Sequence, residues 1–282
     1  MTLVAAWSPW PLQRLIGNLL GDLSWLLLRS RRRVTMRNLE LCFPQWDASR
    51  RAAVGKESFR AAGIALFESS RAWWRSPEAL ADRFEFRGLD RLQAAQAQGR
   101  GVVLFGAHYM HLEIAGAAAS ARFALDIIYR PQNSPALEAL VKWRRQHIYQ
   151  WQIDRRDVRA IYKALKANHI VWYTGDQDFG RKQAVFAPFF GVPAATIVAG
   201  ARFARSNGSV AIGVDFRRDD RNGCYVMEFS EPLAFTGDDH ADAAAMNRQI
   251  EAGILKAPGQ YMWFHRRFKT QEHPRGRYPY QP

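Results

Sequence analysis

The first periodic pattern in the chain lies near its amino end, where apolar residues recur at the spacing of one face of an α-helix. This apolar face consists of Leu12, Leu15, Ile16, Leu19, Leu20 and Leu23. Polar residues and glycines fill most positions between them, and tryptophans flank the segment on both sides. The pattern predicts an amphipathic helix, which is followed at once by the basic residues Arg29, Arg31, Arg32 and Arg33.

Three locations are open for this predicted helix. Arg14, Asn18 and Asp22 interrupt a stretch that would need roughly 20 mostly apolar residues to span a bilayer. The tryptophan flanks and the arginine cluster favour a helix lying in a membrane interface beside anionic headgroups. If it spans instead, the arginines place the rest of the chain on the cytoplasmic side. The alternative to both is a helix packed on the protein's own core.

The remainder of the chain first has a helical pattern over residues 34–75, interrupted at Pro44, after which Asp47 can cap a second helix. Short apolar runs then alternate with helical patterns. We expect strands at residues 84–86, 101–105, 124–129, 169–173, 210–216 and 225–229. We expect helices at residues 89–98, 110–119, 135–149, 156–166, 196–205 and 241–255. This alternation predicts an α/β fold with a mainly parallel central sheet flanked by helices.

The length of the chain, 282 residues, allows one large domain or two small ones. No stretch has the composition of an interdomain linker. We therefore expect a membrane-associated segment over residues 1–33 and a single α/β domain over residues 34–282. Cys42 and Cys224 lie far apart without a CxxC partner, which excludes a disulfide framework and a thiolate zinc site.

Positive charge is concentrated at the two ends of the chain. The formal net charge is +14, and residues 1–60 carry ten Lys and Arg against four Asp and Glu. Such a charge indicates a polyanionic partner, either nucleic acid, anionic lipid or an acidic protein, or simply a solvated basic surface. Because the charge lies beside the apolar segment, a membrane surface is favoured. No nucleic-acid-binding motif is recognisable, so no nucleic acid is expected.

Polar side chains follow three of the predicted strands. His108, Arg130 and Asp176 each come just after the end of an apolar run. In parallel sheets, sites form beyond the carboxyl ends of the strands. The sequence therefore predicts that these three residues share one site.

His108 and Glu113 form a His-x4-Glu pattern whose spacing alone is expected by chance among seven histidines and 26 acidic residues. On one continuous helix, an offset of five residues rotates the side chains apart by roughly 140°. The pair can meet only if His108 lies in the turn before a helix that contains Glu113. A carboxylate on one ring nitrogen would then fix the tautomer while the other nitrogen takes a proton from a hydroxyl. The pattern predicts a general base, His108, oriented by Glu113.

Two alternatives stand beside this prediction. His108 can be a buried residue that caps the helix, with Glu113 a surface acid. His111 competes for the role of base, and a metal site of His108, His111 and Glu113 would lack an outlying ligand, so no metal is expected.

Several ordered blocks, together, resemble a known family. The chain is similar to the late acyltransferases of lipid A biosynthesis, the lauroyl and myristoyl transferases of Gram-negative bacteria, which share the His-x4-Asp/Glu motif with glycerolipid acyltransferases. The similarity extends from Trp10 to Lys269. It is carried by residues 31–44, 106–113, 129–131, 175–180, 189–196 and 262–269.

The resemblance implies an acyltransferase without a cofactor at the cytoplasmic face of the bacterial inner membrane, either peripheral or single-pass. Its donor would be an acyl-carrier-protein thioester, and its anionic lipid acceptor a lipid A precursor with a free hydroxyl. His108 would be the base and Glu113 its partner. The resemblance implies substrate-binding roles for Arg130, Asp176, Asp178, His265, Arg266 and Arg267. Arg130 would bind phosphate, the two aspartates would shape the site or orient Arg130, and the last three would lie near the anionic lipid.

The chain departs from the family pattern in two places. Ser134 stands where the family usually has asparagine, with Asn133 displaced by one position, and residues 257–261 lack the usual glutamates. These departures leave the acceptor open. The alternatives are acyl transfer to another membrane lipid, such as a glycerolipid or aminolipid, and a non-catalytic protein that binds anionic lipid or nucleic acid. The structural alternatives are a surface arginine before a proline turn for Arg130, a turn-capping role for Asp176 and Asp178, and a solvated basic face for the basic block.

Overall fold

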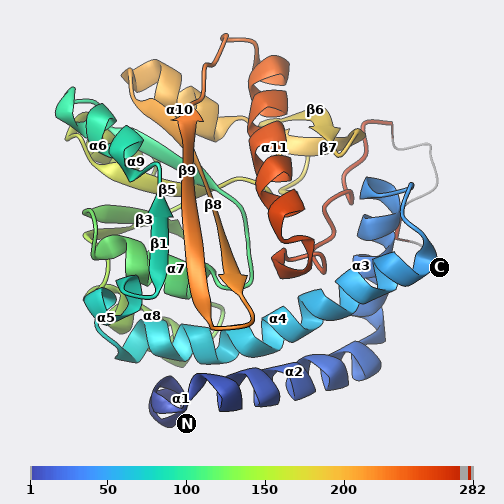
Figure 1. Cartoon of the computed structure of the whole chain (residues 1–282). Helices are drawn as coiled ribbons and strands as arrows, with labels where there is room; N and C mark the ends of the chain where they lie inside the picture. Colours follow the sequence, from blue (N-terminus) through green and yellow to red (C-terminus); the bar gives the residue numbers. More distant parts are fainter. Residues whose placement is uncertain (1, 274–278, 281–282) are drawn as a thin grey trace.

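The computed structural model describes residues 2–273, 279 and 280, and its first part is a set of helices (Figure 1). These are α1 (Thr2–Trp7), α2 (Trp10–Leu27), α3 (Arg29–Cys42), α4 (Ala48–Trp74) and α5 (Pro77–Ala81). The predicted break near Pro44 is confirmed, because α3 ends at Cys42. The Asp47 side chain caps α4 by accepting a hydrogen bond from the Arg50 N–H at 2.7 Å.

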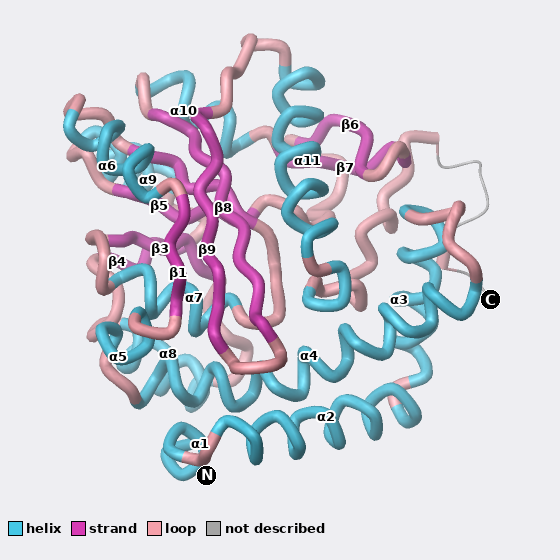
Figure 2. Tube along the Cα trace, in the orientation of Figure 1, coloured by secondary structure: helices cyan, strands magenta, loops and turns pink. Residues whose placement is uncertain are grey.

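A seven-stranded sheet forms the centre of the molecule (Figure 2). Its strands in spatial order are β1 (Phe84–Arg87), β9 (Cys224–Pro232), β8 (Val210–Asp219), β2 (Val102–Gly106), β5 (Ile170–Thr174), β3 (Leu125–Tyr129) and β4 (Trp151–Asp154). Only the pairing of β8 with β9 is antiparallel. The predicted α/β fold with a mainly parallel sheet flanked by helices is therefore confirmed.

Helices cover both faces of this sheet. Because alternate residues of a buried strand point to opposite sides, each strand contributes to a separate core on each face. Leu104 and Trp172 belong to one core cluster, which also contains residues of α7, whereas Val103 and Val171 belong to a second cluster that includes residues of α9 and α10. The remaining helices are α6 (Leu89–Ala97), α7 (Leu112–Ser120), α8 (Pro135–Arg145), α9 (Val158–Lys166), α10 (Ala199–Asn207), α11 (Asp239–Lys256) and the 3-10 turn η1 (Pro258–Gln260).

Two parts of the β-structure are missing from the sequence prediction. The short edge strand β4 was not expected, and neither was the hairpin of β6 (Ala184–Phe189) and β7 (Val192–Ile197). The hairpin turns at Phe190 and Gly191, both with positive φ (49° and 77°), as a two-residue hairpin turn requires. Because Thr196 pairs with Val185 in this hairpin, the helix expected to begin at residue 196 begins instead at Ala199.

Helix α2 packs against α4 through its small and polar side, not through its leucines. The buried residues of α2 are Gln13, Gly17 and Gly21. A Cβ added at Gly21 would lie 2.4 Å from the Cα of Arg60, so the two backbones are nearly in contact. The apolar face therefore points away from the protein, and Leu15 and Leu19 are 58% and 60% exposed.

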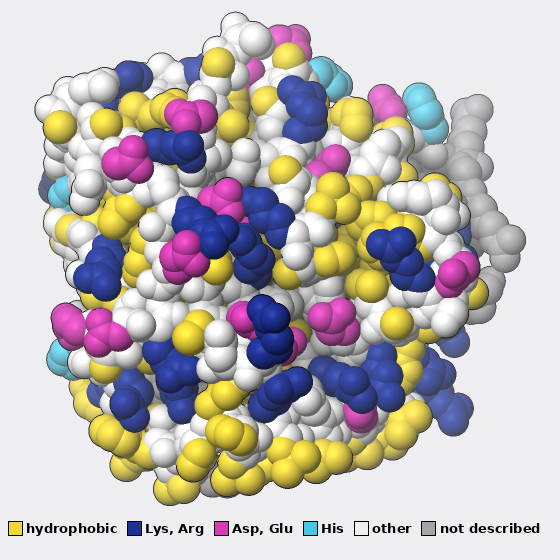
Figure 3. Space-filling model, viewed as in Figure 1, with side chains coloured by type: hydrophobic (Ala, Val, Ile, Leu, Met, Phe, Trp, Pro, Cys, Tyr) yellow, Lys and Arg dark blue, Asp and Glu magenta, His cyan; other side chains and the backbone are white. Residues whose placement is uncertain are grey.

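This exposed apolar face forms a continuous border of the molecule. Figure 3 shows hydrophobic side chains gathered along the lower edge, where Figure 1 places α2, with Lys and Arg side chains above them. The exposed large apolar residues of α1 and α2, with Leu28, are Leu3, Val4, Trp7, Leu12, Leu15, Leu19, Leu20, Leu23, Leu26, Leu27 and Leu28, which we call the leucine face. In the described part of the chain, no helix combines the length and apolarity needed to cross a bilayer.

Candidate active site

The candidate site begins where the buried strand β2 ends. After Gly106 the chain turns, and α7 starts at Leu112 rather than at residue 110, as expected. Met110 is held outside the helix because its N–H donates to the carbonyl of Gln260 at 2.9 Å. His108 therefore lies in the turn before the helix and Glu113 lies in its first turn, as the sequence predicted.

The carboxylate of Asp176 binds His108 at two points. The ring nitrogen Nδ1 lies 2.5 Å from Oδ1, and the backbone N–H of His108 donates to Oδ2 at 3.0 Å. The hydroxyl of Tyr261 also donates to Oδ2, at 2.9 Å. These residues meet because β2 and β5 are parallel neighbours, with Gly106 paired to Thr174, so their carboxyl ends lie side by side.

Asp176 is buried and His108 is partly buried, and the two side chains stabilise each other's charges. Burial alone would lower the pKa of His108, but the charge and hydrogen bond of Asp176 raise it above its ordinary value. Burial alone would raise the pKa of Asp176, but the charge and hydrogen bonds of His108 lower it. The contact also fixes which nitrogen is free: with Nδ1 on the carboxylate, Nε2 remains to accept a proton.

Glu113 lies elsewhere, which corrects the expected contact between Glu113 and His108. Its carboxylate forms an ion pair with the guanidinium of Arg145 and accepts a hydrogen bond from the Trp73 indole N–H at 3.2 Å. In this structure the carboxylate that contacts the imidazole of His108 is that of Asp176. The side chain of Glu113 diverges from His108 because α7 carries it toward α4 and α8, which hold Trp73 and Arg145.

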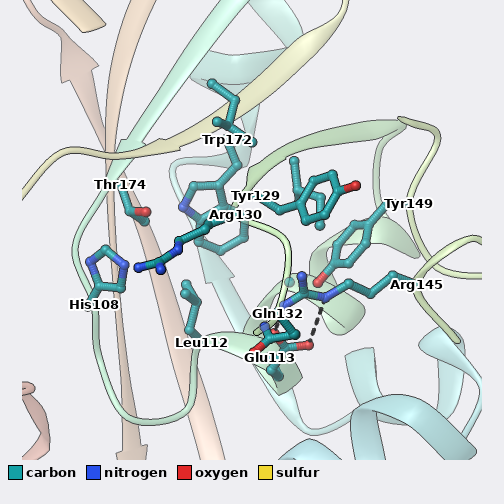
Figure 4. Close-up of a pocket in the computed structure, with 13 residues that line it drawn as sticks. His108, Leu112, Glu113, Tyr129, Arg130, Gln132, Arg145, Tyr149, Trp172 and Thr174 are labelled. Atoms are coloured by element: carbon teal, nitrogen blue, oxygen red, sulfur yellow. Dashed lines mark hydrogen bonds and ion pairs between the residues drawn. The ribbon is translucent and has the colours of Figure 1, made fainter. Parts of the chain in front are cut away.

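Glu113 and His108 nevertheless line one pocket, with a volume of about 260 Å³ (Figure 4). Its walls are formed by His108, Leu112, Glu113, Gly116, Ile127, Ile128, Tyr129, Arg130, Gln132, Arg145, Tyr149, Trp172 and Thr174. In Figure 4 the side chain of Arg130 extends toward the ring of His108. The predicted grouping of His108, Arg130 and Asp176 at one edge of the sheet is thus observed. The pocket combines apolar walls with two guanidinium groups.

His111, the competing candidate, lies outside this pocket. Its ring is buried, and Nε2 lies 3.2 Å from the carbonyl oxygen of Phe216. Burial, with the nearby charge of Arg218, lowers its pKa to about 3. His111 is therefore a neutral core residue. Among the described residues, no three His, Cys, Asp or Glu side chains are grouped so that they could hold a metal ion.

Comparisons with known proteins show the family to which this chain belongs. The profile of the family described as bacterial lipid A biosynthesis acyltransferase matches residues 1–270. The chain is 36% identical over 265 residues to the lipid A biosynthesis palmitoleoyltransferase of Escherichia coli K12, covering 93% of this chain and 87% of that protein. This chain belongs to the lipid A biosynthesis acyltransferase family. It is therefore an acyltransferase, and the alternative of a non-catalytic binding protein is set aside.

Two further relatives extend the comparison. The lipid A biosynthesis lauroyltransferase of the same organism is 34% identical over 269 residues, covering 93% of this chain and 87% of that protein. The lipid A biosynthesis myristoyltransferase is 24% identical over 257 residues, covering 90% and 80%. The three relatives are named for three different acyl chains, so membership of the family does not by itself specify the chain that this acyltransferase transfers.

The other predicted residues of this acyltransferase have different surroundings. Asp178 is buried and ties its loop to the carboxy-terminal segment, since Thr270 donates to it through its N–H (2.7 Å) and its hydroxyl (2.9 Å). Gly180 N–H donates to the same carboxylate at 2.8 Å, which matches the turn-forming alternative. Asp178 therefore links the loop after β5 to Thr270, and within the described part of the chain it has no hydrogen bond or ion pair with Arg130.

The basic block at residues 265–267 divides into three environments. Arg266 is exposed, whereas Arg267 is 3% exposed and donates to the carbonyl of Ala195 at 2.7 Å and to the hydroxyl of Thr196 at 2.9 Å. The guanidinium of Arg267 is thus occupied inside the protein, which corrects its expected place beside a lipid. His265 is half-buried, and its Nε2 accepts a hydrogen bond from the Asp178 N–H at 3.2 Å.

Sequence reasoning missed Tyr261 and Arg145. Tyr261 lies 85 positions from Asp176, and Arg145 lies 32 positions from Glu113. No periodic pattern relates positions so far apart. The only signal for Tyr261 was its place immediately before the block at residues 262–269, and Arg145 had none.

Proposed function

We propose that this acyltransferase moves a fatty acyl chain from an acyl-carrier-protein thioester to a hydroxyl of a lipid A precursor, with His108 as general base. The observation that carries the proposal is the His108–Asp176 pair at the wall of a pocket with apolar and cationic sides. Membership of the family supports the lipid acceptor. The carrier-protein donor is the part that rests on resemblance alone.

In the proposed reaction, the acceptor O–H loses its proton to Nε2 of His108 while its oxygen attacks the thioester carbonyl carbon. Asp176 holds the imidazole in the tautomer with hydrogen on Nδ1 and stabilises the imidazolium that forms. The tetrahedral intermediate then expels the sulfur, which takes the proton back from Nε2 and leaves as a thiol. The ester bond replaces the thioester bond, and His108 returns to its starting form.

Arg130 and Glu113 have separate roles in this proposal. The guanidinium of Arg130 faces the pocket beside His108, where a two-pronged donor suits a phosphate group. Glu113 acts through Arg145, because its carboxylate neutralises that guanidinium and links the first turn of α7 to α8. We infer that Glu113 is a positioning residue for the pocket wall and that Asp176 is the orienting residue of the base.

The leucine face supports a membrane location for the reaction. An amphipathic helix that buries its glycines and exposes its leucines is suited to lie in a bilayer interface. Arginines at positions 29, 31, 32 and 33 follow the helix and suit anionic headgroups. We propose that this face docks on the cytoplasmic side of the bacterial inner membrane.

The proposed function is tested by incubating the enzyme with an acyl-carrier-protein thioester and a tetra-acylated lipid A precursor. Wild type should acylate the precursor, and His108→Ala should lose at least about 10²-fold in rate, the usual contribution of a general base. Full activity in His108→Ala would exclude His108 as the base. Activity with a glycerolipid and none with the precursor would exclude only the lipid A acceptor.

The chain offers a matched control for this experiment. His169 and Asp126 form a second His–Asp pair, with Nδ1 2.8 Å from Oδ2, at the opposite edge of the sheet, where β5 begins. His169→Ala breaks an equivalent buried contact away from the pocket. It should keep its turnover rate, so that a loss confined to His108→Ala reports on chemistry rather than on folding.

A further inference from the structure

His265 lies near the His108–Asp176 pair but does not line the pocket. Met262, three positions earlier, donates its N–H to the carbonyl of His108 at 3.2 Å. Asp178, whose N–H binds His265, is two positions from Asp176. His265 is close enough to Asp176 and His108 that both charges act on its pKa. Asp178, which binds the His265 ring, and Met262, which binds the backbone of His108, therefore both connect His265 to the catalytic pair.

The hydrogen bond from Asp178 determines the tautomer of this histidine. The Asp178 N–H donates to Nε2 of His265, so Nε2 must carry a lone pair and the neutral ring must carry its hydrogen on Nδ1. Burial lowers the pKa of His265 to about 4, although the charge of Asp176 opposes this shift. Near neutral pH the side chain is therefore an uncharged donor, and not the cation expected from a basic block.

Nδ1 of His265 is open to a ligand. Among residues 2–273, 279 and 280, no side chain or backbone group forms a hydrogen bond with this nitrogen. Unlike Nδ1 of His111, which is buried without a partner, Nδ1 of His265 is not buried. The ring is half-buried, so one edge faces the protein through Nε2 and the other edge remains accessible. An accessible, oriented N–H beside a general base can act on a substrate.

The backbone around His265 is held rigidly. The side-chain amide of Asn38 donates to the carbonyl of Trp263 at 2.6 Å and to that of His265 at 2.7 Å. Asn38 in turn accepts a hydrogen bond from the Tyr280 hydroxyl at 2.6 Å. A donor fixed in this way needs little reorganisation when charge develops in front of it, which is the condition for electrostatic stabilisation of a transition state.

We propose that His265 is a catalytic residue that donates its Nδ1–H to the carbonyl oxygen of the acyl donor and stabilises the oxyanion formed when the acceptor attacks. This inference rests on the proposed function, because it assigns a role in that reaction. The hydrogen stays on Nδ1 throughout, and the residue exchanges no proton. Removing one such donor lowers kcat by roughly 10²–10³-fold.

Two substitutions separate this role from a purely structural one. In His265→Asn, the amide nitrogen takes the place of Nδ1, so the donor is kept and the acceptor for the Asp178 N–H is lost. In His265→Gln, the amide oxygen takes the place of Nε2, so that acceptor is kept and the donor is lost. We expect His265→Asn to keep kcat within about tenfold of wild type and His265→Gln to lose roughly 10²–10³-fold, with little change in KM.

Rates are measured as thiol release from an acyl-carrier-protein thioester, both with the lipid A precursor and with water as acceptor. His240→Asn, the same substitution at an exposed histidine, serves as control. A higher kcat for His265→Gln than for His265→Asn, or wild-type rates for both, overturns the role of His265 while leaving the proposed function intact. A wild type that releases thiol only with water overturns the acceptor assignment alone. A wild type that releases no thiol with either acceptor overturns both proposals.

Discussion

Asp176 holds His108 by its ring and by its backbone at the same time. One carboxylate oxygen lies 2.5 Å from Nδ1, and the other accepts the His108 N–H at 3.0 Å. The first contact orients the imidazole, and the second fixes the turn that carries it. Because Asp176 is 1% exposed, water does not compete for either contact. This double attachment makes Asp176, and not the nearby Glu113, the residue that orients the proposed base.

Replacing Asp176 by Asn should therefore remove most of the activity. The amide cannot stabilise an imidazolium, and its NH₂ group can favour the wrong tautomer of His108. We expect kcat to fall by at least about 10²-fold in thioester turnover, the scale of general-base catalysis. Circular dichroism and the thermal midpoint should show that the variant is folded. A variant with wild-type kcat would mean that the His108–Asp176 contact does not serve the reaction.

The pH profile should carry the signature of the same pair. In the proposed reaction the base acts as the uncharged imidazole, and the charge and hydrogen bond of Asp176 raise the pKa of His108 above 6.5. We therefore expect kcat/KM to fall as the pH drops through a value above 6.5. In Asp176→Asn the raising charge is gone while burial remains, so this acid limb should move to lower pH. An acid limb at the same pH in both proteins would contradict the assignment.

The stability of the fold should change over the same range with the opposite sign. A histidine whose pKa is raised in the folded protein stabilises it fully below its unfolded pKa, near 6.5, and this contribution is lost as pH rises through the raised value. Urea unfolding of wild type and of Asp176→Asn across this range checks the prediction. The difference between the two proteins should shrink as pH increases.

Glu113 and Arg145 should behave as a unit. If Glu113 acts by holding Arg145, Glu113→Gln and Arg145→Gln should lower kcat/KM by similar factors. The double variant should then have a kcat/KM little lower than that of either single variant. The side chains are 21% and 14% exposed, so each single variant also leaves a poorly solvated charge. A double-mutant cycle on kcat/KM measures the coupling. Additive losses, with Glu113→Gln far more damaging, would instead restore a direct role for Glu113 at His108.

The contrast between Glu113 and Asp176 shows that sequence patterns predict local structure but not contacts that depend on strand order. The apolar run at residues 101–105 and the following turn are local, so they correctly predicted that His108 precedes the helix and that Glu113 lies in it. Which carboxylate reaches the imidazole depends on strand order. One neighbour of β2 is β5, and Asp176, which follows β5, lies 68 positions from His108 in the sequence; no local spacing encodes that strand order.

For helix α2, the sequence pattern likewise predicted the local structure but not the packing. Periodicity correctly identified an apolar face and a face of polar residues and glycines. It did not say which face meets the protein, because that depends on the shape of α4. Gly17 and Gly21 allow a backbone approach that leucines would prevent, so the apolar face is left outside.

This close approach makes Gly63 a sensitive position. A Cβ at Gly63 would lie 2.0 Å from the carbonyl oxygen of Gly17, a backbone atom that cannot move independently. Although Gly→Ala normally stabilises a helix by up to about 1 kcal/mol, we expect Gly63→Ala to destabilise the protein by about 1–3 kcal/mol. Gly55→Ala in the same helix meets movable side-chain atoms of Trp25 at 3.0 Å and should cost less. Urea unfolding midpoints measure both, and equal effects would contradict the packing argument.

The exposed leucines of the leucine face should determine how strongly the protein binds a membrane. If the leucine face enters a bilayer interface, replacing Leu15 and Leu19 by Ser removes apolar surface whose burial stabilises the bound state by roughly 1.5–3 kcal/mol per fully buried side chain. Allowing for shallow burial, we expect co-sedimentation with vesicles containing anionic phosphatidylglycerol to weaken at least about tenfold. The double variant Val158→Ser/Leu255→Ser removes exposed apolar residues from α9 and α11 and is the matched control. Binding should also weaken with added salt, since arginines follow the helix. Equal binding by the two double variants would show that another surface meets the membrane.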